Sequence, residues 1–185
     1  ETAAYETIIR QLPTPIAVEI GCGRGVFLRQ FAQQNPDKTI VGIEIRKRIA
    51  LELQDRLVRL NLTNAYSIYG EGRQVITDLL SPNQIDTLFI FHPDPWLKKR
   101  HHNRRFIHKT TLDSIRPMLA KKAKLYSITD VAELYHAMQA SIIACPWLEL
   151  LSDDTAFWQA GYASHWQRFS ERDNRACYTL TAQVR

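Results

Sequence analysis

Short apolar runs alternate along the chain with longer segments in which apolar residues recur every three or four positions. The runs that predict strands are 16–20, 39–45, 65–69, 85–91, 123–129 and the alternating segment 176–184. The segments with helical spacing are 26–34, 49–60, 73–80, 106–119 and 132–143. Short apolar strands that alternate with helices are typical of crossover units on a parallel sheet. The pattern therefore predicts an α/β fold.

The predicted sheet is Rossmann-like, doubly wound and mostly parallel, with 176–184 as an antiparallel last strand. In such sheets ligands bind at the carboxyl ends of the strands. No internal repeat or linker divides the sequence, so we expect one domain over residues 1–185. The chain begins at Glu1 rather than at a methionine, so an N-terminal extension could be missing.

The composition excludes several protein classes. Hydrophobic residues make up 45% and charged residues 23%, as in soluble globular proteins. No apolar run reaches the roughly 18 residues that span a bilayer, and the first residues lack the pattern of a signal peptide. Cys22, Cys145 and Cys177 are too few and too widely spaced for a disulfide framework or a zinc cluster. We expect a cytoplasmic protein without metal or membrane contact.

The charges are unevenly distributed. Lys and Arg number 24 against 19 Asp and Glu, a net charge of +5. Five of these cations lie in segment 98–105, which holds no acid, so the rest of the chain balances at 19 against 19. Such a block favours an anionic partner, most simply a phosphate backbone. A solvated basic loop is the alternative, and for the run taken alone it is the more common case.

A glycine-rich turn follows the first predicted strand, where Glu19 leads into Gly21, Gly23 and Gly25 with one residue between successive glycines. Glycines there let the backbone turn tightly and approach a ligand at the start of the next helix. Glu44 comes at the end of the second strand, where a carboxylate can accept from both hydroxyls of a ribose. Glu71, after the third strand, could accept from an adenine amino group. Together these residues favour a nucleoside site.

No basic residue accompanies these acids, so the nucleoside end of the ligand is expected to lack phosphate. S-adenosylmethionine fits that description better than NAD or ATP. The segment Glu19–Gly25 together with Glu44 resembles the class I S-adenosylmethionine-dependent methyltransferases. That pattern occurs in enzymes with many different substrates and does not choose among them.

The loop after the fourth predicted strand holds Asp94 between Pro93 and Pro95. The two prolines fix φ on both sides of the acid and remove two backbone donors, which makes the loop stiff. A rigid surface turn with an incidental acid is one interpretation. The basic run that follows favours another, a substrate that is both anionic and rich in hydrogen-bond donors. RNA or DNA with an exposed guanine has both properties.

This loop resembles the signature of the tRNA (guanine-N7-)-methyltransferase family, which is Pro-Asp-Pro-Trp, then Lys, then a basic run that closes on paired basic residues. Pro93–Trp96, Lys98 and Arg104–Arg105 match it. Thr129–Asp130 resembles the Thr-Asp pair of the family, and Ser164–Ser170 resembles its Thr-x-aromatic-Glu motif. The resemblance extends from about Val18 to the C-terminus.

The resemblance implies methyl transfer from S-adenosylmethionine to N7 of a guanine in the variable loop of tRNA, by a monomer or a homodimer. The cofactor contacts that it implies are Glu19, Glu44, Glu71 and Asp94, to which the glycine turn adds Gly21 and Gly23. The substrate contacts that it implies are Lys98, Asp130, Ser164 and Gln167, to which the basic run adds Arg100 and Arg104 as phosphate contacts. We expect Asp94 to be the catalytic residue, which orients the donor or the base and stabilises the cationic product. Arg105 is expected to hold phosphate together with the other cations of the run.

Three positions depart from the family pattern. His92 replaces an aromatic or aliphatic residue, Ser164 replaces Thr, and Gln167 replaces Glu. The last change removes charge-assisted bonds to guanine, and each weakened bond could cost on the order of 1 kcal/mol. The long basic N-terminal segment of the family is also missing. A divergent member that binds cofactor and RNA with an altered substrate, or with weak or no catalysis, is therefore the alternative. A small-molecule methyltransferase would leave the five clustered cations unexplained.

Overall fold

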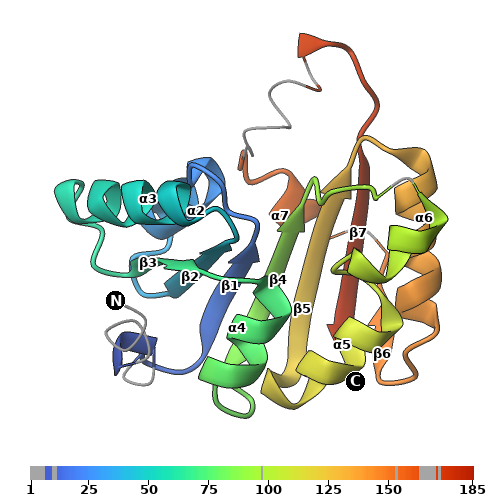
Figure 1. Cartoon of the computed structure of the whole chain (residues 1–185), viewed down its shortest axis with the longest axis horizontal. Coiled ribbons are helices and arrows are strands. Elements are labelled where there is room, and N and C mark those ends of the chain that lie inside the picture. Colours follow the sequence, from blue (N-terminus) through green and yellow to red (C-terminus); the bar gives the residue numbers. More distant parts are fainter. Residues whose placement is uncertain (1–6, 10–11, 97, 153, 163–169, 171) are drawn as a thin grey trace.

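The central feature of the computed structural model is one seven-stranded sheet (Figure 1). The structure describes residues 7–9, 12–96, 98–152, 154–162, 170 and 172–185. The strands are β1 (Ile16–Ile20), β2 (Thr39–Glu44), β3 (Ala65–Tyr69), β4 (Ile85–Phe91), β5 (Leu119–Thr129), β6 (Leu148–Leu150) and β7 (Tyr178–Val184). Their order is β3-β2-β1-β4-β5-β7-β6, with β7 antiparallel to β5 and to β6 and all other pairs parallel. The predicted doubly wound, mostly parallel sheet with an antiparallel last strand is confirmed.

Helices cover both faces of this sheet. They are α2 (Val26–Gln34), α3 (Lys47–Arg59), α4 (Gly72–Leu79), α5 (Lys109–Ile115), α6 (Ala132–Ile143) and the single turn α7 (Thr155–Trp158), with 3₁₀ turns η1 (Lys99–Arg104) and η2 (Arg116–Met118). One apolar cluster joins α4, α5 and α6 to one face, and a second joins α2, α3 and α7 to the other. Because both faces are covered, most side chains of β1 and β2 and of the central part of β4 are buried and apolar.

The winding direction of the sheet reverses between β1 and β4, which are neighbours although far apart in sequence. The helices that follow these two strands, α2 and α5, pack on opposite faces, and in this architecture ligands usually bind where the winding reverses. Phe27, in the first turn of α2, packs edge-on against Phe89 and Phe91 of β4 with ring centroids 4.7 Å apart in both pairs. This aromatic contact fixes the glycine turn relative to β4.

Four elements differ from the sequence prediction. The helix predicted over 106–119 is divided into α5 and η2, because Pro117 has no N–H to continue an α-helix. Strand β5 consequently starts at Leu119 rather than at 123. The edge strand β6 and the turn α7 are too short to give a periodic pattern and were not predicted. Among the described residues no helix has the length and apolar character needed to cross a membrane.

Candidate functional site

The strands that carry Glu19 and Glu44 end at the same edge of the sheet as β4, which leads to Asp94. Ile20, the last residue of β1, pairs with Ile43 on one side and Ile90 on the other. The glycine turn, Glu44 and the loop that starts at His92 therefore leave the sheet at the same level. Two backbone hydrogen bonds reinforce this edge, from Gly21 N to Ile43 O at 2.8 Å and from His92 N to Ile128 O at 2.7 Å.

The glycine turn has the left-handed backbone that its composition predicts, with φ of 71° at Gly21, 54° at Gly23 and 68° at Gly25. Glycine is required at position 25 for two reasons. Its backbone is left-handed, and a Cβ there would lie 2.4 Å from Cδ1 of Leu53 on α3. Nothing lies within 4 Å of a Cβ built on Gly21. The turn therefore packs tightly against α3 at Gly25 and leaves open space beside Gly21, as a cradle for a ligand requires.

Glu44 is buried beside this turn and connects it to the end of β2. Its Oε2 accepts from the N–H of Gly23 at 3.0 Å and from NH2 of Arg46 at 3.2 Å, and its Oε1 accepts from N and Nε of Arg46 at 2.9 and 2.8 Å. Burial alone would raise the pKa of Glu44, but these donors outweigh it and hold the pKa below its ordinary value. Glu44 is therefore an ionised acceptor, as the sequence predicts, and Arg46 is its partner, which the sequence analysis missed.

Glu19 lies beneath the glycine turn and is only 4% exposed. Burial raises its pKa well above the ordinary value, the charge of Glu44 adds to this, and the backbone N–H of Leu28 in α2 opposes it. Its Oε2 has no hydrogen-bond partner among the described residues. Glu19 is thus a buried group whose pKa is raised and which favours the neutral acid.

Glu71 is exposed and caps helix α4. Its two oxygens accept from the backbone N–H groups of Arg73 and Gln74 at 3.1 and 2.9 Å, an arrangement worth about 1 kcal/mol to a helix.

Two apolar side chains near Glu44 were missed by the sequence analysis. Ile45, just after β2, is 65% exposed and Tyr69, at the end of β3, is 48% exposed. Both flank Glu44, because Tyr69 is its register partner, and together they offer an apolar surface to a flat ring.

Asp94 is exposed in a loop bounded by two residues with left-handed backbone, His92 at φ 45° and Trp96 at φ 42°. The pKa of Arg46 is raised chiefly by its hydrogen bond to Glu44 and in smaller part by the negative charge of Asp94. The Asp94 carboxylate therefore lies close enough to Arg46 for the two charges to interact.

The cations of the basic run divide into exposed and buried groups. Lys98, Arg100 and Arg104 are exposed, and the guanidinium of Arg104 lies over the ring of Trp96, 5.2 Å from its centroid. Arg105 is 6% exposed and donates through Nε to the carbonyl of Pro95 at 2.9 Å. The prediction that Arg105 holds phosphate is wrong, because its guanidinium faces inward and fixes the loop that carries Asp94.

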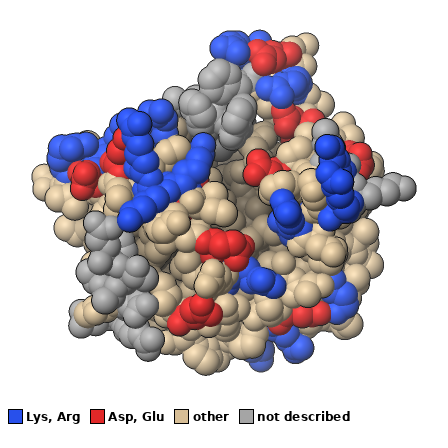
Figure 2. Space-filling view, viewed as in Figure 1, with Lys and Arg blue, Asp and Glu red and all other residues tan. Residues whose placement is uncertain are grey.

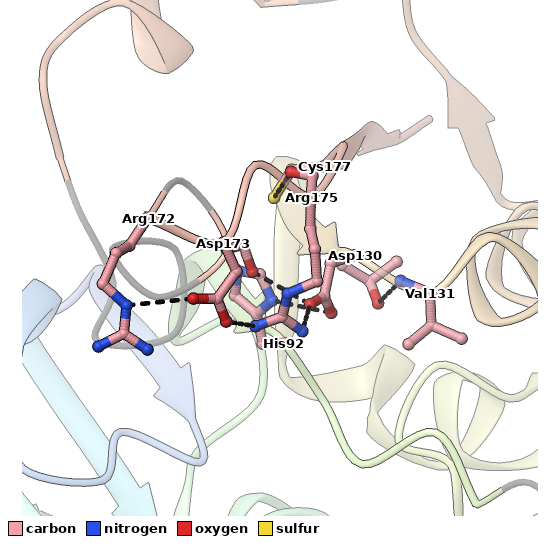
Figure 3. A network of polar contacts seen from close by, with 9 residues as sticks. His92, Asp130, Val131, Arg172, Asp173, Arg175 and Cys177 are labelled. Atoms are coloured by element: carbon pink, nitrogen blue, oxygen red, sulfur yellow. Dashed lines mark hydrogen bonds and ion pairs between the residues drawn. The ribbon is translucent and has the colours of Figure 1, made fainter.

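Asp130, at the carboxyl end of β5, is the centre of a polar network (Figure 3). Its Oδ2 accepts from Oγ of Ser170 at 3.1 Å and from NH1 of Arg175, and its Oδ1 lies 3.6 Å from Nδ1 of His92. Burial would raise the pKa of Asp130, but Ser170, its own backbone, Arg175 and His92 together lower it.

Ser164 and Gln167 lie outside the described residues. Within the described part of the chain, His, Cys, Asp and Glu form no group of three that could hold a metal ion.

Known proteins with similar sequences are methyltransferases. The family described as "Putative methyltransferase" matches residues 13–182. Proteins named tRNA (guanine-N(7)-)-methyltransferase from Streptococcus pneumoniae strains Hungary19A-6 and CGSP14 are each 32% identical over 146 residues, which cover 76% of this chain and 69% of the relative.

Solved structures share the fold at low sequence identity. A SAM-dependent methyltransferase from Aquifex aeolicus has a TM-score of 0.64 at 11% identity over 97% of this chain and 89% of that one. The 16S rRNA methyltransferase KamB has a TM-score of 0.65 at 15% identity over 100% and 94% of the two chains. The resemblance found in the loop Pro93–Trp96 is confirmed by the sequence match, and this chain belongs to the tRNA (guanine-N(7)-)-methyltransferase family.

Proposed function

We propose that this protein is a single-domain methyltransferase that transfers the methyl group of S-adenosylmethionine to N7 of a guanine in tRNA, in the variable loop. The observation that carries the proposal is the shared sheet edge, which brings the glycine turn and Glu44 beside the Asp94 loop and its exposed cations. Family membership supports the same reaction. We further propose a cytoplasmic protein that acts as a monomer or a homodimer.

The residues at the edge fit the cofactor. Glu44 is an ionised acceptor suited to ribose hydroxyls, Gly21 leaves space for close approach, and Ile45 and Tyr69 offer an apolar surface for adenine. When bound, S-adenosylmethionine supplies an electrophilic methyl group. We propose that Gly23 contacts it beside Glu44. Glu19 would contribute from below through its unpartnered oxygen, and Glu71 would do so only by giving up part of its cap on α4.

The chemistry at guanine sets what Asp94 must do. N7 carries an in-plane lone pair and no proton, so the reaction requires no general base. The protein must hold the reacting atoms about 3–3.5 Å apart and aligned. Positive charge moves onto the purine as the new bond forms. An exposed carboxylate held between two prolines can orient the base and stabilise that charge, because its position is fixed before the reaction starts.

The tRNA is proposed to bind across this edge. Figure 2 shows Lys and Arg side chains gathered on both sides of a hollow in this view, one group over α3 and another on the side of α6. Lys98, Arg100 and Arg104 would hold phosphates, and Asp130, Ser164 and Gln167 would grip the Watson–Crick edge of the guanine. Since N7 lies on the major-groove edge, the base must be loosened from the folded RNA to reach the site.

The experiment that tests the proposed function is incubation of the protein with labelled S-adenosylmethionine and bulk tRNA, followed by chain cleavage at N7-methylguanine. Label in the tRNA together with cleavage in the variable loop supports the proposal. Label in small molecules alone, or label in tRNA without cleavage, contradicts it.

Arg104→Ala is expected to weaken tRNA binding and to lower the slope of log affinity against log salt by about 1, because one phosphate contact is lost. Fluorescence anisotropy with labelled tRNA at several salt concentrations measures this slope. Arg104→Lys should keep the slope, since the charge remains. Lys38→Ala, an exposed cation just before β2 at the opposite edge of the sheet, is the matched control. An unchanged slope in Arg104→Ala would favour the alternative that the basic run is a solvated loop without a phosphate contact.

A divergent enzyme with weak or no catalysis is the second candidate, and the neutral Gln167 is the observation that favours it. Gln167→Glu should raise kcat/KM on tRNA about tenfold if guanine is the substrate, because a carboxylate makes charge-assisted bonds with N1–H and the exocyclic amine. Gln159→Glu adds the same charge at an exposed position after α7 and should change kcat/KM little. A clear loss of activity in Gln167→Glu would indicate adaptation to a different substrate.

A further inference from the structure

The two oxygens of Asp130 face different partners (Figure 3). Oδ2 takes both of the donors that come from the C-terminal part of the chain, Oγ of Ser170 at 3.1 Å and NH1 of Arg175. Oδ1 faces the imidazole of His92, with Nδ1 at 3.6 Å. A carboxylate held by two donors on one oxygen cannot rotate freely, so the direction of Oδ1 is fixed as well.

Arg175 is itself held in place by its own turn. Its backbone N–H donates to the carbonyl of Ser170 at 2.8 Å, and NH2 of its guanidinium lies 3.4 Å from Oδ2 of Asp173. Nε of Arg172 donates to the other oxygen of Asp173 at 3.1 Å. The preceding residue, Asn174, has φ of 52°, a conformation that Asn tolerates and that closes the turn. The guanidinium therefore spans two carboxylates and presents one N–H group to Asp130.

Oδ1 of Asp130 faces the loop that starts at His92 and carries Asp94. His92, which faces Oδ1, precedes Pro93 and lies two positions before Asp94. Its side chain is only 4% exposed, and neither ring nitrogen makes a hydrogen bond with any described residue. Burial lowers the pKa of His92 more than the nearby Asp130 carboxylate raises it, and the charge of Arg175 lowers it further. A neutral imidazole does not neutralise Asp130, so the carboxylate stays an acceptor on that side.

We propose that Arg175 is a positioning residue of the proposed methyl-transfer site, which fixes the Asp130 carboxylate through Oδ2 and leaves Oδ1 as the acceptor for the substrate guanine. The proposal rests on the proposed function, in which Asp130 binds the Watson–Crick edge of the base. Arg175 contacts neither guanine nor cofactor in this scheme. Together with Ser170, Arg175 holds the Asp130 side chain in one orientation. Without these contacts, binding of the base would have to fix that orientation, and part of the binding free energy would be lost.

A competing interpretation predicts the opposite change in tRNA affinity when Arg175 is removed. A guanidinium offers the same pattern of N–H donors as the N1 and exocyclic amine of guanine, so Arg175 could simply occupy Asp130 until the substrate displaces it. Removal of a competitor strengthens tRNA binding, whereas removal of a positioning residue weakens it. The direction of the change in tRNA affinity on losing Arg175 therefore separates the two.

The test is a double-mutant cycle on Arg175→Ala and Asp130→Ala in the full chain. Arg175→Ala should raise KM for tRNA about tenfold, with kcat and the affinity for S-adenosylhomocysteine within about twofold of wild type. Arg175→Lys should restore part of the loss, because one charge can still reach Oδ2. The double variant should be no worse than Asp130→Ala alone, since the two residues act as one unit. Arg185→Ala, which removes an exposed cation just after β7 at the opposite edge of the sheet, is the control and should leave KM near wild type.

Three results would overturn the proposal: a lower KM in Arg175→Ala, additive effects in the double variant, or a parallel fall in kcat, cofactor affinity and thermal stability that marks a purely structural contact. The cycle is also run on the equilibrium affinity for tRNA with S-adenosylhomocysteine present. That measurement judges Arg175 independently of turnover. A wild-type protein that binds tRNA but forms no N7-methylguanine would contradict the proposed function, and the binding cycle would still decide the coupling of Arg175 to Asp130.

Discussion

Asp94→Ala is expected to reduce methyl transfer to tRNA by about 10²–10³-fold in kcat, the range found when one preorganised electrostatic contact to a transition state is removed. The reason lies in where the positive charge is. It resides on sulfur before the reaction and on the purine after it, so the total charge of the site does not change. A carboxylate accelerates the reaction only if it lies closer to the purine than to the sulfur.

The variant Asp94→Asn separates the charge of this side chain from its shape. If Asp94 stabilises the charged purine, kcat of Asp94→Asn should fall nearly as far as kcat of Asp94→Ala. The affinity for S-adenosylmethionine should then change by less than about threefold. If Asp94 mainly holds the sulfonium, cofactor affinity should fall and kcat should fall less. Single-turnover kinetics and calorimetry measure the two quantities. Asp37→Ala, an exposed acid in the turn before β2, is the control. Full turnover in Asp94→Ala would remove this residue from the mechanism.

The fold could be predicted because its strands are buried on both faces. Every residue of β2 is buried, and such strands appear in the sequence as unbroken apolar runs between helical segments. The glycine turn was predictable for a related reason, since three left-handed residues in close succession leave glycine as the residue without a steric penalty. Elements of three or four residues, such as β6 and α7, contain too few positions for a period to be visible.

The parts of the site that the sequence did not predict depend on contacts between distant residues. Arg175 and Asp130 are 45 positions apart, and no local pattern marks them as partners. Arg104 and Arg105 are adjacent and chemically identical, yet one is exposed and the other is buried under the loop. They differ because Arg105 donates to the carbonyl of Pro95 in the loop, a contact between residues that no sequence period marks. Glu71 did carry a local signal, because an acid just before a helical segment is a common N-cap.

Glu44→Gln is expected to weaken binding of S-adenosylhomocysteine by about 10²-fold, because charge-assisted hydrogen bonds to a ligand are worth roughly 1.5–3 kcal/mol each. The amide keeps one acceptor, but its NH₂ group must then face either Arg46 or the N–H of Gly23, which are both donors. The glycine turn would lose its tie to β2 as well as its contact with the ribose. Calorimetric titration measures the affinity. Glu52→Gln removes an exposed carboxylate that pairs with Arg48 on α3 and should leave the affinity unchanged.

The pH dependence of wild-type binding gives a second test of the same residue. The donors from Arg46 and Gly23 outweigh burial and hold the pKa of Glu44 below its ordinary value of 4.5. A depressed pKa means that the carboxylate stays ionised as the pH falls, and that its contribution is lost only below the ordinary range of glutamate. The contribution of Glu44 to the affinity for S-adenosylhomocysteine should therefore be constant from neutral pH down to that range, and Glu44→Gln should show no loss attributable to this group. A midpoint above 4.5 that disappears in Glu44→Gln would mean that burial and the nearby Glu19 dominate, and that Arg46 does not hold Glu44 in the way described.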